Sequence, residues 1–246
     1  MFDDTTALAI FSAIFLAGLL KGANGVGFQS VGIAFLTIIT NLPNAISLLL
    51  IPSLVTNLWQ AGSGKEFFPI LIRIWPFIIT SSMMVWFGTV ALTTVSIAFL
   101  SAFLGILLIF YSTLSLFGLR FEVKIKNEWW LAPFIGLING LLTGMTGILV
   151  IPCVFYFNSI GFRKDTLVQA MGILFTALTL MLIVSLKMNN ILSLELSGWS
   201  AFAILPSIIG VLVGQLIRKK ISEEIFKRIF FFCLIVLGSF ISFNAL

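Results

Sequence analysis

Two glycine-rich octets, one in each half of the chain, carry most of the residues that could bind a ligand. The first octet reads GLLKGANG over residues 18–25, the second reads GLLTGMTG over residues 140–147, and they share five of their eight residues. Glycine takes a positive φ at no steric cost, so such a stretch can interrupt a helix. A helix that restarts after an interruption presents N–H groups and a positive dipole end, which favour an anion. The octets therefore predict a binding site for negative charge.

Lys21 is the charge placed deepest in an apolar segment, so it is the main candidate for contacting an anion. An ammonium inside a membrane is costly, and its usual explanation is a partner or substrate of opposite sign. The other candidates are octet glycines and polar residues beside the octets or in the apolar segments that follow them. The predicted substrate-binding residues are Lys21, Gly22, Asn24, Gly25, Gly27, Gln29, Ser30, Asn57, Asn139, Thr143, Gly144, Thr146, Gly147 and Gln169.

A structural interpretation of the same residues stays open. Gly18 with Gly22, and Gly140 with Gly144, form GxxxG pairs that allow two membrane helices to pack closely. Lys21 could also extend its ammonium along the helix to the membrane surface.

The composition indicates that the octets lie in a membrane. Of the 246 residues, 60% are hydrophobic and only 9% are charged, whereas a soluble domain carries about 25% charged residues. Apolar runs long enough to span a bilayer occur over the whole length. The sequence therefore predicts an all-α polytopic membrane protein with a single transmembrane domain over residues 1–246. The net charge of +5 is assigned to short connectors rather than to a nucleic-acid surface.

Eight apolar segments divide the chain into two similar halves. The first and fifth are longer than one span, and glycine-rich cuts at residues 22–27 and 144–147 leave flanks of about 10–15 residues, which are short for a span. We therefore expect each to form a re-entrant or hairpin segment, followed in each half by three full spans. The segments lie at about 6–39, 44–61, 67–89, 93–117, 129–157, 167–187, 197–217 and 225–244.

The basic residues favour this hairpin arrangement over two single crossings. With hairpins, the basic connectors all face the cytoplasm, as the positive-inside rule requires, and both termini face outwards. An odd number of full spans per half then inverts the second half relative to the first. We expect repeat 1 over about 6–118 and repeat 2 over about 129–245, an architecture typical of transporters with a midplane site between two broken hairpins. The basic connector residues are Lys65, Arg120, Lys124, Lys126, Arg163, Lys164, Arg218, Lys219 and Lys220.

Several functions are disfavoured by residues that the chain lacks. It has no His, and its nine acidic residues lie in connectors or near segment ends, which argues against a cation site or a carboxylate proton relay. Cys153 and Cys233 are solitary, so no metal site is predicted. No hydrolase or nucleotide-binding motif is present, so we expect neither an enzyme nor a cofactor.

The pattern GLxxGxxG at the head of each half, continued in the second as GILVIP over residues 147–152, resembles the TauE/SafE family of membrane transporters. The first copy departs from the family, because it has Lys21, Asn24, Gln29 and Ser30 where the resemblance implies small or apolar residues and the Pro. The resemblance implies export of small sulfur oxyanions and organosulfonates, such as sulfite and sulfoacetate, across the bacterial inner membrane. We therefore expect a secondary transporter for a small anion, embedded in the lipid bilayer in monomeric or homo-oligomeric form. The alternatives are a passive anion channel and a non-transporting scaffold subunit.

Overall fold

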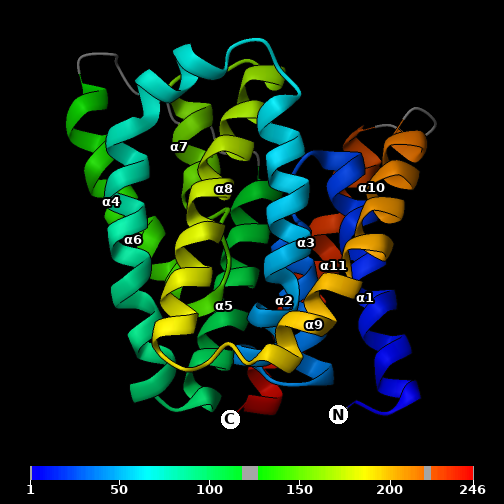
Figure 1. The fold of residues 1–246 in the computed structure, drawn as a ribbon. Helices are drawn as coiled ribbons and strands as arrows, with labels where there is room; N and C mark the ends of the chain where they lie inside the picture. The colour runs from blue at the N-terminus through cyan, green and yellow to red at the C-terminus, as the bar shows by residue number, and fades with distance from the viewer. Residues whose placement is uncertain (1, 118–126, 219–222, 246) are drawn as a thin grey trace. The chain divides into compact units, whose positions relative to one another are not determined.

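The computed structural model describes residues 2–117, 127–218 and 223–245, and over these residues the regular secondary structure is helical, with no strands, which confirms the predicted all-α fold class. Figure 1 shows the helices in their chain order. Their bounds are α1 Asp4–Asn24, α2 Phe28–Ile39, α3 Leu42–Gly62, α4 Phe67–Thr94, α5 Ile97–Leu116, α6 Glu128–Thr146, α7 Cys153–Ser159, α8 Lys164–Met188, α9 Leu194–Phe202, α10 Ile204–Arg218 and α11 Glu223–Ala245.

Seven helical stretches within the described residues are long and apolar enough to cross a membrane. Six of them coincide with the six predicted full spans, and the run Leu194–Ile217, which contains α9 and most of α10, counts as one of these. The seventh is α1. The protein is therefore a multi-pass membrane protein. The predicted cytoplasmic residues Arg120, Lys124, Lys126, Lys219 and Lys220 lie outside the described residues.

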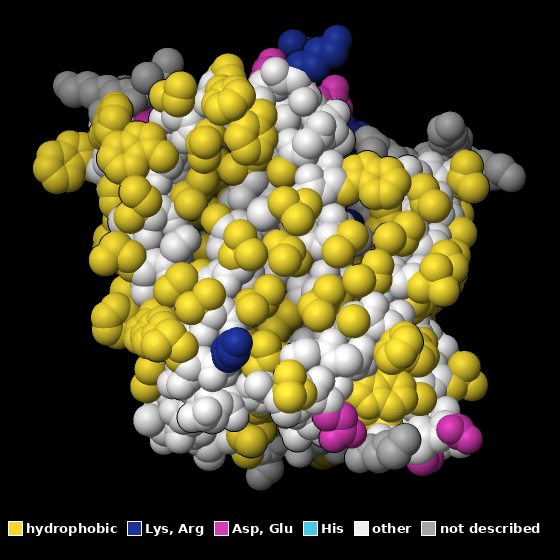
Figure 2. Space-filling view, viewed as in Figure 1, with side chains coloured by type: hydrophobic (Ala, Val, Ile, Leu, Met, Phe, Trp, Pro, Cys, Tyr) yellow, Lys and Arg dark blue, Asp and Glu magenta, His cyan; other side chains and the backbone are white. Residues whose placement is uncertain are grey.

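The surface of the helices suits a hydrocarbon solvent. In Figure 2, hydrophobic side chains predominate over charged ones on the face shown. On α4, Phe68 and Ile72 are each 71% exposed and Phe87 is 61% exposed. Such exposure is unfavourable in water and favourable among lipid chains, so these side chains form lipid-facing surface.

The predicted positions of the helix interruptions need correction. α1 has 21 residues and α6 has 19, so the flank before each break is longer than the predicted 10–15 residues. The flank after the first break, α2, has 12 residues, and the one after the second, α7, has seven. Gly22 and Gly144 lie inside these helices, and the non-helical stretches are the first break, residues 25–27, and the second break, residues 147–152. Glycine inside a helix costs about 1 kcal/mol relative to alanine, and the close packing described below offsets that cost.

The chain divides into two compact units, each of which combines segments from both halves. Unit 1 comprises Met1–Pro52, Val95–Leu119 and Ile191–Leu246, and unit 2 comprises Ser53–Thr94 and Arg120–Asn190. In unit 1, α1 packs against α10 and α5 against α11, and in unit 2, α6 packs against α4. Both chain termini lie at the same end of unit 1 (Figure 1). The inverted repeat and the membrane side of the termini stay predictions.

In unit 1, the glycines of the first octet form the contact surface between α1 and α10. A Cβ atom at Gly18 would overlap the carbonyl oxygen of Ser207, and one at Gly22 would overlap that of Val211. α10 contributes a glycine to the same contact, since a Cβ atom at Gly214 would overlap the carbonyl oxygen of Leu19. The two backbones are therefore in direct contact, as a GxxxG pair permits.

In unit 2, the glycines of the second octet form the contact surface between α6 and α4. Cβ atoms at Gly140 and Gly144 would overlap the carbonyl oxygens of Ser81 and Val85. The partner residues are again a Ser and a Val four positions apart, as in unit 1. The packing interpretation of the GxxxG pairs is therefore confirmed in both halves. That Gly22 and Gly144 also contact a substrate stays a prediction.

Candidate functional site

The first break is a three-residue turn made by two glycines. Gly25 has φ +80° and Gly27 has φ +102°, a region that residues with a Cβ rarely adopt. The Gly25 N–H donates to the Lys21 carbonyl oxygen (2.7 Å), which closes α1. The Val31 N–H donates to the Gly27 carbonyl oxygen (3.0 Å), which opens α2 at Phe28. The first N–H groups of α2 precede this bond and point out of the helix end.

Lys21 places a buried ammonium beside this helix end. The residue is 5% exposed, and its Nζ lies 5.8 Å from the centroid of the Phe28 ring, in the first turn of α2. Its side chain is therefore enclosed by protein rather than extended to the surface. Gln29 and Ser30 are also buried in this turn, at 6% and 2% exposure, and Asn24 is half-buried. A positive charge and a helix N-terminus thus share one buried location in unit 1.

The second break is longer and is built differently. Gly147, with φ +74°, ends α6, and its N–H donates to the Thr143 carbonyl oxygen (2.7 Å). Residues 148–152 follow in non-helical conformation, and the peptide bond between Ile151 and Pro152 is cis. The helix that follows, α7, has only seven residues.

Two threonine hydroxyls of α6 hold the backbone of the second break. Thr143 Oγ1 donates to the Ile148 carbonyl oxygen (2.9 Å). Thr146 Oγ1 donates to the Leu142 carbonyl oxygen (2.7 Å) and accepts the Ile148 N–H (3.3 Å). Both threonines are fully buried. Because each hydroxyl has one proton to donate, these two protons serve the protein's own backbone.

Asn139 lies one turn earlier on α6 and is fully buried. Its Oδ1 accepts the N–H of Cys153, the first residue of α7, at 3.1 Å. Its Nδ2 is buried and has no hydrogen-bond partner among the described residues. The octet spacing does not single out this residue, and sequence gives no signal for its bond to Cys153.

The two remaining predicted polar residues have protein partners in unit 2. Asn57 Nδ2 donates to Thr179 Oγ1 at 3.3 Å. Gln169 Nε2 donates to the Ala61 carbonyl oxygen (2.9 Å), and its Oε1 accepts the Glu66 N–H (3.1 Å). Gln169 thus joins α8 to the backbone at the end of α3, which is a structural role.

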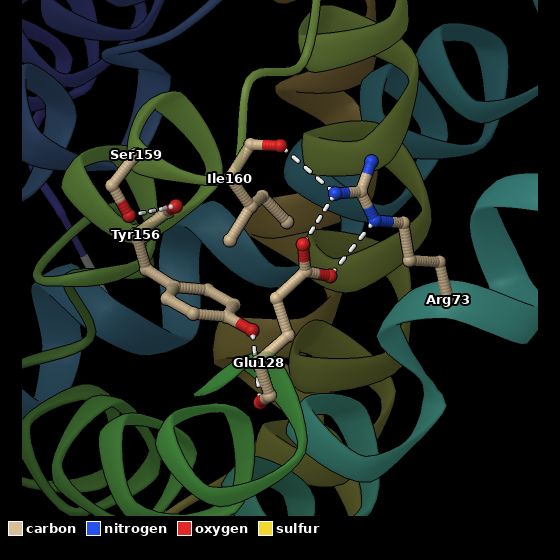
Figure 3. Close-up of polar contacts among 5 residues, drawn as sticks. All are labelled: Arg73, Glu128, Tyr156, Ser159 and Ile160. Carbon is tan, nitrogen blue, oxygen red and sulfur yellow. Dashed lines mark hydrogen bonds and ion pairs between the residues drawn. The ribbon is translucent and has the colours of Figure 1, made fainter. Parts of the chain in front are cut away.

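A second polar cluster in unit 2 surrounds Arg73 of α4 (Figure 3). Its guanidinium grips the Glu128 carboxylate through Nε (3.0 Å) and one Nη (2.7 Å), and that Nη also donates to the Ile160 carbonyl oxygen (2.8 Å). The ring of Phe162 lies 4.9 Å from the guanidinium carbon, within cation–π range. Arg73 therefore joins α4 to the start of α6 and to the residue after α7. The sequence alone does not identify these partners.

Apart from Asn57 and Gln169, the predicted site residues thus lie at two breaks, one in each unit. Those of the first octet and the first turn of α2 surround the first break in unit 1, and Asn139, Thr143, Thr146 and the second-octet glycines surround the second break in unit 2. That both groups serve one midplane site stays a prediction.

A comparison with models of protein families gives one match. The family described as "Sulfite exporter TauE/SafE" matches residues 10–241, nearly the whole chain. Neither the curated proteins nor the solved structures that were compared with the chain gave a match.

Proposed function

Because the chain belongs to the sulfite exporter TauE/SafE family, a family of transporters of sulfur-containing anions, we propose that it is a secondary transporter that exports a sulfur oxyanion or organosulfonate, such as sulfite or sulfoacetate. The proposal includes a bacterial inner-membrane location with both termini outside the cytoplasm. It also includes alternating access, in which two repeats rock around a fixed site.

The observation that carries the anion part of this proposal is the burial of Lys21 at the N-terminal end of α2. Lys21 belongs to the last turn of α1, and its Nζ lies 5.8 Å from the centroid of the Phe28 ring in the first turn of α2. The first N–H groups of α2 and the positive end of its dipole lie at this same helix end. A sulfonate or sulfite group has several acceptor oxygens, which suit an ammonium and backbone N–H groups together. A cation would meet repulsion from both.

The membrane potential supplies a driving force for export. A potential that is negative inside favours the outward movement of an anion by about 2.3 kcal/mol per charge per 100 mV. Export can therefore proceed as uniport, without a carboxylate that couples it to protons. This agrees with acidic residues that lie in connectors or near the ends of segments.

The test is anion flux in proteoliposomes that contain the full chain, with sulfite, sulfoacetate, taurine and sulfate offered in parallel under an imposed potential. We expect saturable flux of a sulfur-containing anion that increases as the potential favours its exit. Lys21→Gln should reduce that flux at least about tenfold, the effect of losing one charge-assisted contact. Lys187→Gln is the matched control, because Lys187 is an exposed lysine near the end of α8.

The outcomes separate the proposal from its alternatives. Flux that rises linearly with concentration would indicate a passive channel on the same scaffold. Absence of flux for every anion would favour a non-transporting scaffold subunit. Normal flux by Lys21→Gln at wild-type expression would remove Lys21 from the substrate path.

A further inference from the structure

The amide of Asn139 has a fixed orientation at the second break. Its Oδ1 accepts the Cys153 N–H at 3.1 Å. Turning the amide over would bring Nδ2 against the Cys153 N–H and oppose two donors, so the bond assigns the oxygen and nitrogen positions. The Nδ2 group therefore points away from the first residue of α7 with its protons directed elsewhere.

That Nδ2 group is a buried donor without a partner among the described residues. The residue is 0% exposed, so bulk water does not reach it from the surface of the structure. A donor buried without an acceptor loses its hydration and gains nothing in exchange. A ligand oxygen or an enclosed water must therefore complete its hydrogen bonds.

The neighbouring hydroxyls do not offer the same capacity. The protons of Thr143 and Thr146 are donated to the backbone carbonyls of Ile148 and Leu142. Of the three polar residues predicted for the second break, only Asn139 has donor capacity that the described protein leaves unused. The break thus combines a backbone held by two threonine hydroxyls with one buried amide donor that lacks an acceptor among the described residues.

We propose that the Nδ2 group of Asn139 is a second contact for the exported anion and donates to one of its oxygen atoms. This inference rests on the proposed function and deepens it, because it assigns the same substrate a neutral donor in unit 2. A neutral donor selects for acceptor oxygens without adding charge. It therefore favours an oxyanion such as a sulfite or sulfonate group and orients it at the second break.

The test is the concentration dependence of sulfite or sulfoacetate flux, whichever the wild-type protein carries, for two variants of the full chain. Asn139→Asp retains an oxygen for the Cys153 N–H but replaces the donor with an acceptor. Asn139→Ala removes the donor without adding charge or bulk, so the question is decided even where the Asp variant does not fold. We expect the apparent KM to rise about tenfold to hundredfold in both, while the maximal flux per folded molecule changes less than threefold.

Asn158→Asp is the matched control, because Asn158 is an exposed asparagine of α7 whose Nδ2 donates to the Val154 carbonyl oxygen (2.8 Å). It should leave the apparent KM unchanged. A wild-type KM in either folded Asn139 variant would overturn the inference and would assign the Nδ2 group to an enclosed water. That result leaves the proposed function intact, whereas absence of flux in the wild-type protein would overturn the proposed function itself.

Discussion

The two breaks begin alike and end differently. Each follows a helix whose GxxxG pair presses against backbone carbonyls of a partner helix in its own unit, α10 in unit 1 and α4 in unit 2. Beyond that shared surface, the first break is a short glycine turn beside a buried ammonium, and it opens a twelve-residue helix. The second break is longer, is held by side-chain hydrogen bonds and opens a helix of seven residues.

This difference indicates which part of the repeated octet serves which purpose. The glycines are common to both octets because both helices need the same close approach to their partners. The residues at the fourth and seventh octet positions differ, with Lys21 and Asn24 in the first copy and Thr143 and Thr146 in the second. The repeat thus preserves packing, while charge is confined to the first break and backbone support to the second.

The largest expected effect tests the shared part. Gly22→Ala and Gly140→Ala each place a Cβ against a backbone carbonyl oxygen, of Val211 and Ser81 respectively, which cannot swing aside as a side chain can. We expect each to lower the free energy of unfolding by about 3 kcal/mol or more, at the upper end of overpacking effects. Melting temperature and folded yield in detergent are the measurements.

Gly62→Ala is the control for both substitutions, because a Cβ at this helical glycine meets no described atom within 4 Å. It should be neutral or slightly stabilising. A large loss in one unit with no loss in the other would contradict the conclusion that the two octets share a packing role.

A smaller effect tests the reliance of the first break on glycine. Gly27→Ala forces a side chain onto φ +102° and brings its Cβ to 2.7 Å from the buried ring of Phe230. The left-handed backbone alone costs about 1–2 kcal/mol, and the ring contact adds to it. Gly161→Ala is the matched comparison, since Gly161 has φ +79° and open space around its Cβ position.

We therefore expect Gly27→Ala to lower the melting temperature more than Gly161→Ala does. Phe230→Leu should reduce the destabilisation caused by Gly27→Ala, measured as a double-mutant cycle in detergent. Equal losses for the two glycines, with no coupling to residue 230, would mean that backbone conformation alone determines the requirement at Gly27.

The predictable part of the molecule is the part set by hydrophobic length and glycine spacing. The six full spans and both GxxxG surfaces follow from apolar runs and from glycines four residues apart. The exact ends of the breaks could not be predicted from sequence. Gly22 and Gly144 lie in glycine-rich stretches that suggest a break, yet they are helical and pack against partner helices that are distant in sequence. A glycine allows a helix either to end or to pack closely against another helix. Which of the two occurs depends on the residues that surround the glycine in the folded structure.

The predicted site shows the same division. Lys21 could be found from sequence because a lone charge in an apolar segment is conspicuous. The roles of Thr143 and Asn139 could not, because they depend on where residues 148–153 turn back across α6. Likewise, the ion pair between Arg73 and Glu128 could not be predicted from their spacing, because the two residues are 55 positions apart in the sequence.

The smallest expected effect tests whether side-chain hydrogen bonds hold the second break. Thr146→Val keeps the shape of the side chain but removes the hydroxyl that accepts the Ile148 N–H. A buried N–H that loses its acceptor costs about 1–3 kcal/mol, so we expect a loss in that range from chemical or thermal unfolding in detergent. Thr143→Val should cost less, about 0.5–1.5 kcal/mol, because it only deprives the Ile148 carbonyl oxygen of a donor, and a carbonyl tolerates this better than an N–H tolerates the loss of its acceptor.

Thr176→Val provides the baseline for these two substitutions, because Thr176 Oγ1 only donates back to the Gly172 carbonyl oxygen within α8 (2.7 Å). Such a bond adds little to a helix, so its removal should change stability by less than about 0.5 kcal/mol. The expected order of destabilisation is Thr146→Val, then Thr143→Val, then Thr176→Val. If all three variants matched the wild-type protein, the second break would be held by its packing alone, and the contrast with the glycine-dependent first break would disappear.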